Sequence, residues 1–190
     1  MIEQHPWEPF LPSNSKILFL GSFPPQKGKW GIDFYYPNKQ NDFWRIIGKV
    51  FYDDYLHFFN LTSKQFDKDT IIKFISQKGI AMGDCAYEVK RLKGNASDKF
   101  LEIIKPLDIL STLSKIPNCL HIATTGTKAA EILADITNTK IPKMGNYTVL
   151  HFGDRIIKIF RMPSTSRAYP LAIDKKTRFY HQLFLDTEIL

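Results

Sequence analysis

Two short segments of the sequence combine small polar residues with aromatic rings in a pattern that suits a flat heterocyclic ligand. The first runs from Gly21-Ser22-Phe23-Pro24 through Phe34-Tyr35-Tyr36 to Asn41-Asp42-Phe43-Trp44. Aromatic rings stack on a nucleobase, and small polar groups hydrogen-bond its edge. Four basic residues flank this segment and could meet phosphates: Lys27, Lys29, Lys39 and Arg45.

The residues of this first segment also have purely structural interpretations. Gly21 can simply make a tight turn, and Asn41 is a good N-cap for a following helix. Phe43 and Trp44 are more typical of a core than of a ligand contact. The local sequence leaves both interpretations of Asn41 open.

The second segment, Pro163-Ser164-Thr165-Ser166-Arg167, follows Met162. Its hydroxyls could donate to phosphates, although Pro-Ser-Thr-Ser is also ordinary turn and cap chemistry. Further along the chain, a charge run either adds phosphate contacts or simply faces solvent. This run consists of Lys175, Lys176 and Arg178.

The remaining chemistry-bearing residues form no recognisable site. The five histidines show no metal-ligand spacing, and the two cysteines cannot supply the four thiolates of a zinc ribbon. Gly21-Ser22-Phe23-Pro24 lacks the glycines and the lysine of a phosphate-cradling loop. We therefore expect no metal site.

Length and composition indicate one globular domain over residues 1–190. The chain has 190 residues, of which 44% are hydrophobic and 24% charged. A net charge of +7 and a pI near 9.3 favour a polyanionic partner such as nucleic acid. The sequence shows no transmembrane run, no signal peptide and no disulfide framework. We therefore expect a cytoplasmic protein without a membrane partner.

Hydrophobic patterning predicts the elements that must position these segments. Short apolar runs predict strands at residues 16–21, 79–84, 119–124, 147–152 and 155–160, the last two joined as a hairpin. Helical spacing predicts helices from near residue 41, over 64–77, over 107–116, over 128–136 with Thr127 as cap, and a last one ending near Leu185. Residues 88–99 are expected to form a polar, basic stretch outside these elements.

This order of elements predicts an α/β fold with a mostly parallel central sheet and helices on both faces. In such sheets the ligand site lies beyond the carboxyl ends of the strands. Residues 22–40 and 162–170 follow predicted strands and are therefore expected to border one site.

The two segments resemble, in order and in type, the motifs of the uracil-DNA glycosylase superfamily. Gly21-Ser22-Phe23-Pro24, Tyr35-Tyr36 and Asn41-Asp42-Phe43-Trp44 are similar to its first motif. Met162-Pro163-Ser164-Thr165-Ser166 resembles its Pro-Ser-x-Ser loop, which enters the minor groove. The nearest branch is the hypoxanthine-DNA (deoxyinosine) glycosylases, followed by the mismatch-specific uracil glycosylases. Weaker similarity lies around Asp84 and after Thr125.

The resemblance implies a three-layer α/β/α fold with a mostly parallel, four-stranded central sheet. It implies hydrolysis of the N-glycosidic bond of a deaminated base, hypoxanthine or uracil, in base-excision repair. The expected partner is DNA containing a damaged base. No metal and no organic cofactor would be needed, and a monomer is expected.

The resemblance also assigns roles to individual residues. Asn41 would be catalytic and would position a water molecule or the base. Base-binding residues would be Gly21, Ser22, Phe23 and Tyr36, with Tyr36 as the stacking ring. DNA-binding residues would be Pro163, Ser164, Thr165, Ser166, Arg167 and Lys175. Arg167 would be the wedge that fills the gap left by a flipped nucleotide.

Two residues depart from the pattern of the superfamily. Phe23 stands where the best-known uracil glycosylases carry a catalytic Asp or Asn, and Met162 stands where some relatives carry His or Asn. Two alternatives therefore stay open. The first is a catalytically inactive nucleic-acid-binding protein of the same fold, with Phe23 or Met162 filling the pocket. The second is a small-molecule nucleoside hydrolase, which would lack a basic groove.

Overall fold

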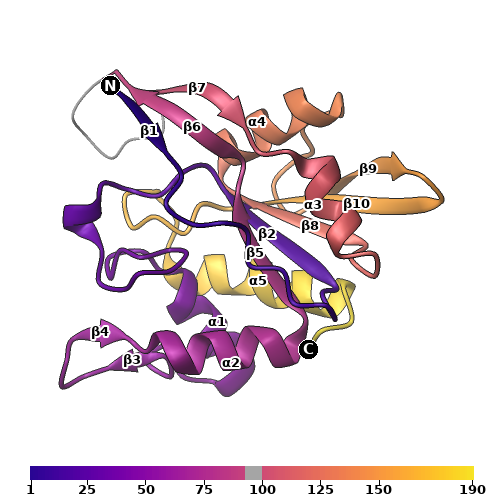
Figure 1. The fold of residues 1–190 in the computed structure, drawn as a ribbon. Helices are drawn as coiled ribbons and strands as arrows, with labels where there is room; N and C mark the ends of the chain where they lie inside the picture. Colours follow the sequence, from indigo (N-terminus) through magenta and orange to yellow (C-terminus); the bar gives the residue numbers. More distant parts are fainter. Residues whose placement is uncertain (93–99) are drawn as a thin grey trace.

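The central sheet has five strands, four of which are parallel (Figure 1). In the computed structural model, which describes residues 1–92 and 100–190, the strand order is β5 (Ile80–Asp84), β2 (Ile17–Gly21), β8 (His121–Thr125), β10 (Arg155–Met162) and β9 (Tyr147–Phe152). The predicted α/β fold class is thus confirmed. The sheet has one strand more than the resemblance implied, because β9 pairs antiparallel with β10 and adds an outer edge.

Helices cover both faces of the sheet (Figure 1). One face carries α1 (Phe43–Tyr52), α2 (Lys68–Lys78) and α5 (Ile173–Asp186), and the other carries α3 (Ile109–Lys115) and α4 (Thr127–Thr137). Successive side chains of β2 alternate between the two cores: Phe19 packs with the first group of helices and Leu18 with the second. Every residue of β2 is buried, as the run of apolar residues predicts for a strand covered on both faces.

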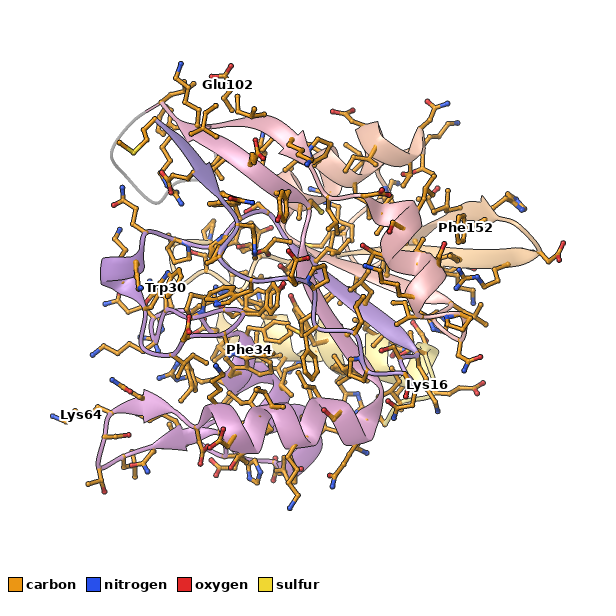
Figure 2. All side chains as sticks on the ribbon, viewed as in Figure 1. Lys16, Trp30, Phe34, Lys64, Glu102 and Phe152 are labelled. Carbon is orange, nitrogen blue, oxygen red and sulfur yellow. The ribbon has the colours of Figure 1, made fainter. Side chains whose placement is uncertain are left out.

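The helix predicted over residues 64–77 starts later than expected. It begins at Lys68, and the Asp67 carboxylate caps it by accepting a first-turn N–H. The preceding residues form β4 (Gln65–Phe66), which pairs with β3 (Phe59–Asn60) in a short hairpin. Figure 2 shows Lys64 at the tip of this hairpin and Phe152 on the β9–β10 hairpin, at opposite sides of the view.

The predicted cap of α4 is wrong. Gly126, with φ +105°, occupies the N-cap position, and no side chain caps this helix. The Thr127 hydroxyl instead accepts a hydrogen bond from Arg161 at 3.1 Å. Gly126 is needed here because its α-carbon passes close to Ser164, so a β-carbon would lie 3.3 Å from that side chain.

A second, three-stranded sheet was not predicted. It consists of β1 (Ile2–Gln4), β6 (Ala86–Arg91) and β7 (Leu101–Pro106), in the order β1-β6-β7. The expected polar stretch therefore contains most of a strand, whose outward polar residues hide the inward Val89. The rest of that stretch, residues 93–99, lies outside the described residues.

The loop between β2 and α1 is held in place by its own aromatic residues. After the short 3₁₀ helix η1 (Lys27–Lys29), the Trp30 indole N–H donates to the Pro25 carbonyl at 2.7 Å. Phe34 and Tyr35 are buried. Figure 2 shows Trp30 and Phe34 on this loop, on the side of the molecule that carries η1. The long loop is therefore a packed structure that can position functional groups.

Candidate active site

A pocket of about 650 Å³ opens where the parallel strands end. It is lined by Gly21, Ser22, Phe23, Pro24, Pro25, Tyr36, Pro37, Asn38, Gln40, Asn41, Asp84, Thr125, Ser164, Thr165, Ser166, Ala168, Tyr169 and Pro170. Both segments singled out in the sequence contribute to this lining. The expectation that they border one site is therefore confirmed, and the pocket lies at the carboxyl ends of β2, β5 and β8 as expected for an open α/β sheet.

Tyr36 presents an aromatic ring in this pocket. One face of the ring stacks on Phe43, with centroids 3.9 Å apart and planes 7° apart, so only the other face or the edge can meet a ligand. The Tyr36 hydroxyl hydrogen-bonds the Thr125 hydroxyl at 2.8 Å. Burial raises the pKa of Tyr36 well above its usual value, so the phenol stays protonated. The backbone of Tyr36 is in the left-handed region, with φ +52°, which the surrounding packing must hold.

Asn41 joins the two loops and also lines the pocket. It forms an isolated antiparallel bridge with Ser166, and the next residue, Asp42, donates its N–H to the Thr165 carbonyl at 2.9 Å. The Asn41 side-chain oxygen accepts the Phe43 N–H at 2.9 Å. Asn41 is not the N-cap of α1, because Asp42 occupies that position and its side chain makes no capping bond. Asn41 instead bonds the N–H of Phe43 from one residue further out while it lines the pocket.

The hydrogen bond from Phe43 fixes the orientation of the Asn41 amide. Because Oδ1 must face the donor, Nδ2 points the other way, and within the described part of the chain it donates to no protein group. Asn41 therefore offers N–H donors to a ligand.

Asp84, at the end of β5, supplies a carboxylate to the pocket. Its Oδ2 lies 2.9 Å from His5 Nε2. Its Oδ1 lies against the backbone of Gly21, where a β-carbon would be only 2.3 Å away. Sequence reasoning noted Asp84 only for weak similarity, although its place at the end of a predicted strand was a usable signal. His5 gave no signal, since 79 residues separate it from Asp84.

The turn after β2 forms the wall beside Asp84. The Gly21 and Ser22 carbonyls accept the N–H groups of Cys85 and Ala86 at 2.8 and 3.1 Å, which aligns the two strand ends. Within the described residues, the Ser22 and Phe23 N–H groups donate to no backbone carbonyl outside the sheet ladders. The Phe23 ring is 8% exposed and packs on Ala86 and its neighbours, so it lines the pocket without filling it.

The residues 163–167 have unequal exposure. Pro163 is buried, and its carbonyl accepts the Tyr180 hydroxyl at 3.0 Å, while Thr165 is 2% exposed. Ser164 and Ser166 lie on the pocket rim, and each hydroxyl accepts the N–H two residues ahead. Only the serines therefore combine access to solvent with free hydroxyl donors. Met162, just before this loop, is buried in the core and does not line the pocket.

The carboxylate of Asp42 ties this loop to α1. Its Oδ2 lies 3.2 Å from Lys176 Nζ, and its Oδ1 lies 3.0 Å from Arg167 Nε. Lys176 also donates to the Ser166 carbonyl at 2.8 Å. Because Lys176 is 1% exposed, the suggestion that it contacts phosphates is wrong. Arg167 does not line the pocket, but it follows Ser166, which does, and half of its side chain is exposed.

No lysine or arginine of the described residues lines the pocket, but the loop between β2 and α1 carries basic side chains. Lys27, Lys29 and Lys39 are exposed. Arg45 donates to the Lys39 carbonyl at 2.8 Å, and its guanidinium lies over the Phe59 and Phe66 rings of the β3–β4 hairpin. Lys175 is exposed on α5 along a separate hollow that also includes Phe179 and Met144.

No group of three or more His, Cys, Asp or Glu side chains in the described part of the chain could hold a metal ion. No helix in residues 1–92 and 100–190 is long and apolar enough to cross a membrane.

Comparison with known proteins identifies the fold. No protein-family model and no curated protein sequence matches the chain. The five-stranded sheet between two helical layers is a fold of the uracil-DNA glycosylase type. One similar structure is the solution NMR structure of a protein from Methanosarcina acetivorans that is provisionally named a uracil DNA glycosylase. The TM-score is 0.67, the sequence identity is 21%, and the match covers 99% of each chain. The resemblance seen in the motifs is thus confirmed for the fold.

The contact between Gly21 and Asp84 predicts the effect of adding one methyl group. Gly21→Ala would place a β-carbon 2.3 Å from Asp84 Oδ1, so the carboxylate must move. We expect a loss of about 1–3 kcal/mol in the free energy of unfolding, measured by urea denaturation. Gly28→Ala is the control, because its β-carbon would meet nothing within 4 Å. Equal stability of the two variants would contradict the close contact.

The buried ion pair predicts a second stability change. Lys176→Met leaves the Asp42 carboxylate with only the half-exposed Arg167, and we expect a loss of about 3 kcal/mol in the free energy of unfolding. Lys175→Met, the exposed neighbour, should stay within about 0.5 kcal/mol of wild type. The double variant with Asp42→Asn should recover part of the loss, because it leaves no uncompensated buried charge. A Lys176→Met protein as stable as Lys175→Met would show that the pair does not hold the loop.

Proposed function

We propose that the protein is a monofunctional DNA glycosylase that hydrolyses the N-glycosidic bond of a deaminated base, hypoxanthine or uracil, in DNA. The observation that carries this proposal is the presence of Asn41 and Asp84 in one pocket with the Tyr36 ring. Asn41 offers hydrogen-bond donors, Asp84 offers an acceptor, and Tyr36 offers a stacking surface. Together they can hold a flat heterocycle by its edge and its face.

The Asn41 and Asp84 side chains suit the edge that deamination creates. Deamination replaces an exocyclic amine by a carbonyl and puts a hydrogen on the neighbouring ring nitrogen. In the proposed complex, Asn41 Nδ2 donates to the new carbonyl and Asp84 Oδ1 accepts the new N–H. Adenine or cytosine in the same register would set donor against donor and acceptor against acceptor, at a cost of about 1–3 kcal/mol for each unsatisfied group.

Cleavage in this pocket would rest on electrostatic stabilisation. An amide is a weak base, so the base would leave first, as an anion, and water would then attack an oxocarbenium-like sugar. Asn41 and the backbone N–H groups of Ser22 and Phe23 would stabilise the departing base. Stacking on Tyr36 would offset part of the cost of flipping, at roughly 1–3 kcal/mol. No metal or organic cofactor takes part in this scheme.

The activity would stop at base release. Strand cleavage through a Schiff base needs a lysine amine at the reacting sugar. The residues that line the pocket include no lysine among the described part of the chain, and Lys176 is buried and bonded to Asp42 and Ser166. The proposed product is therefore an abasic site in an unbroken strand.

DNA would approach across the rim formed by the loop of residues 164–167. Ser164 and Ser166 would donate to phosphates, and Arg167 would fill the gap in the base stack. In this proposal Pro163 and Thr165 shape the loop from within, since both are buried. Lys175 could contact only DNA that extends past the pocket. The proposed unit is a single domain, residues 1–190, acting as a monomer.

Two features of the pocket favour this proposal over the alternatives raised by the sequence. A binding protein without catalysis was expected to fill the pocket with Phe23 or Met162, yet Phe23 lines its wall and Met162 lies in the core. A nucleoside hydrolase was expected to lack a basic groove, and the exposed Lys27, Lys29 and Lys39 of the loop before Asn41 could supply the positive charge of one. Both features favour an enzyme that acts on DNA.

A single-turnover assay on labelled oligonucleotides tests the proposal. The panel carries hypoxanthine, uracil, xanthine or a thymine mismatch, in single-stranded and duplex DNA, and the readout is an alkali-labile site. We expect excision of at least one deaminated base. Binding without excision would indicate a binding protein, and cleavage of free nucleosides alone would indicate a nucleoside hydrolase. Either result would overturn the proposal.

Asn41 is expected to affect the rate of excision more than protein stability. Asn41→Ala should lower the single-turnover rate by about 100-fold or more, as removal of one aimed polar group does elsewhere. The loss of its bond to the Phe43 N–H should cost about 1 kcal/mol of stability. Asn60→Ala removes a similar local bond in the β3–β4 hairpin, away from the pocket, and controls for stability. An unchanged excision rate in Asn41→Ala would remove the catalytic assignment.

Arg167 is expected to matter most in duplex DNA. A wedge is needed only where a base must be expelled from the stack, so Arg167→Ala should slow excision from duplex more than from single strands. The matched control is Arg178→Ala, an exposed arginine on α5 that lines the separate hollow. Equal losses on both substrates, with a salt dependence reduced by about one unit of slope, would make Arg167 a phosphate contact instead.

A further inference from the structure

The N-terminal segment brings a histidine to the inner side of the pocket. β1 pairs antiparallel with β6, and the His5 N–H then donates to the Tyr87 carbonyl at 2.7 Å. From there the His5 side chain turns inward and is almost fully buried. Its ring stacks on Tyr35 at 5.8 Å and meets the edge of Phe23 at 5.4 Å. The imidazole is therefore held in one position between two residues of the site loop.

Both ring nitrogens of His5 are engaged. Nδ1 lies 2.6 Å from the Trp7 carbonyl oxygen, and the Trp7 backbone N–H donates to Nδ1 at 3.1 Å. Nε2 lies 2.9 Å from Asp84 Oδ2, so the imidazole hydrogen-bonds this oxygen of the carboxyl group.

The contact with His5 determines which Asp84 oxygen can meet a ligand. Oδ2 is occupied by His5 Nε2, which leaves Oδ1, beside Gly21, as the hydrogen-bond acceptor for the pocket. Without His5, no other side chain in the described residues bonds Oδ2, and the carboxyl group can rotate away from the position that a ring N–H needs.

We propose that His5 is a positioning residue that holds Asp84 Oδ1 in place as an acceptor and thereby sets the selectivity of the pocket for bases with a ring N–H. This inference rests on the proposed function, because it assumes that a base occupies the pocket. His5 would not touch the base. It would act through Asp84, and the N-terminal segment would thus be part of the specificity of the enzyme.

The functional test compares a base with its N-methyl derivative. Duplexes carrying 2′-fluoro-deoxyuridine, which resists hydrolysis, or its N3-methyl form are bound to wild type, His5→Leu and His5→Gln. Methylation removes the N–H, so it should weaken binding to wild type by about 10-fold or more, the size of one hydrogen bond to a charged group. In His5→Leu this penalty should shrink to about 3-fold or less, because Oδ1 is no longer held as an acceptor. His5→Gln can keep a donor near Oδ2 and should therefore restore most of the binding penalty for N-methylation.

Trp7→Phe is the matched control. It removes the 2.9 Å indole bond to Asp33 in the same segment but leaves the contact between His5 and Asp84. This variant should keep the wild-type penalty for N-methylation. An equal penalty in wild type and in folded His5→Leu would overturn the inference, since the penalty would then be steric.

A second measurement does not depend on substrate. The ¹⁵N shifts of the His5 ring report the hydrogen bond between Nε2 and Asp84, and they should change in Asp84→Asn. If they do not change, the inference fails even if bases are excised. If they change while wild type excises no base, the proposed function fails and the contact between His5 and Asp84 stands. This measurement also serves if His5→Leu does not fold.

Discussion

The pocket depends on the ion pairs that the Asp42 carboxylate forms with Lys176 and Arg167. Asp42 lies at the start of α1, while Lys176 comes from α5 and Arg167 from the loop after β10. Lys176 bonds both the Asp42 carboxylate and the Ser166 carbonyl, so one buried cation joins the two loops. A buried ion pair contributes little net stability compared with an apolar pair of similar volume, but it fixes geometry. In this region of the fold, the ion pairs of Asp42 therefore serve to place the two loops precisely.

Within the pocket, the local hydrogen bonds leave specific atoms free. The Phe43 N–H occupies the Asn41 oxygen and directs the amide donors to the ligand. At the end of β5, His5 hydrogen-bonds one carboxylate oxygen of Asp84, and the other oxygen lies beside Gly21. Each polar side chain is thus oriented by a protein partner before any ligand binds. Such preorganisation avoids reorganisation costs during binding and reaction.

The sequence was sufficient for the elements with strong hydrophobic patterns. A short, wholly apolar run favours a buried strand, and the spacing of Phe43 and Trp44 favours a helix. β2 and α1 were therefore predicted at nearly their observed positions. β6 was missed because its buried residues, Ala86 and Val89, are three positions apart, and the register shifts between them break the alternation expected of a strand. Short strands of this kind depend on partners that the local sequence does not contain.

The candidate site was also predicted only in part. Loops after parallel strands converge, so placing Tyr36, Asn41 and Ser164 around one pocket needed only strand order. Lys176 was misread from a run of charges, although its spacing to Tyr180 and Leu183 puts it on the buried face of α5. His5 could not have been found, because its pairing with Asp84 results from tertiary packing of the N-terminal segment.

A structure of the protein with duplex DNA carrying a 2′-fluoro deaminated nucleotide tests the central claim most directly. The account predicts that the base is flipped into the pocket, stacked on Tyr36, with its carbonyl at Asn41 Nδ2 and its ring N–H at Asp84 Oδ1. A base that remains stacked in the duplex, or one that enters the pocket without contacting Asn41 and Asp84, would contradict the account.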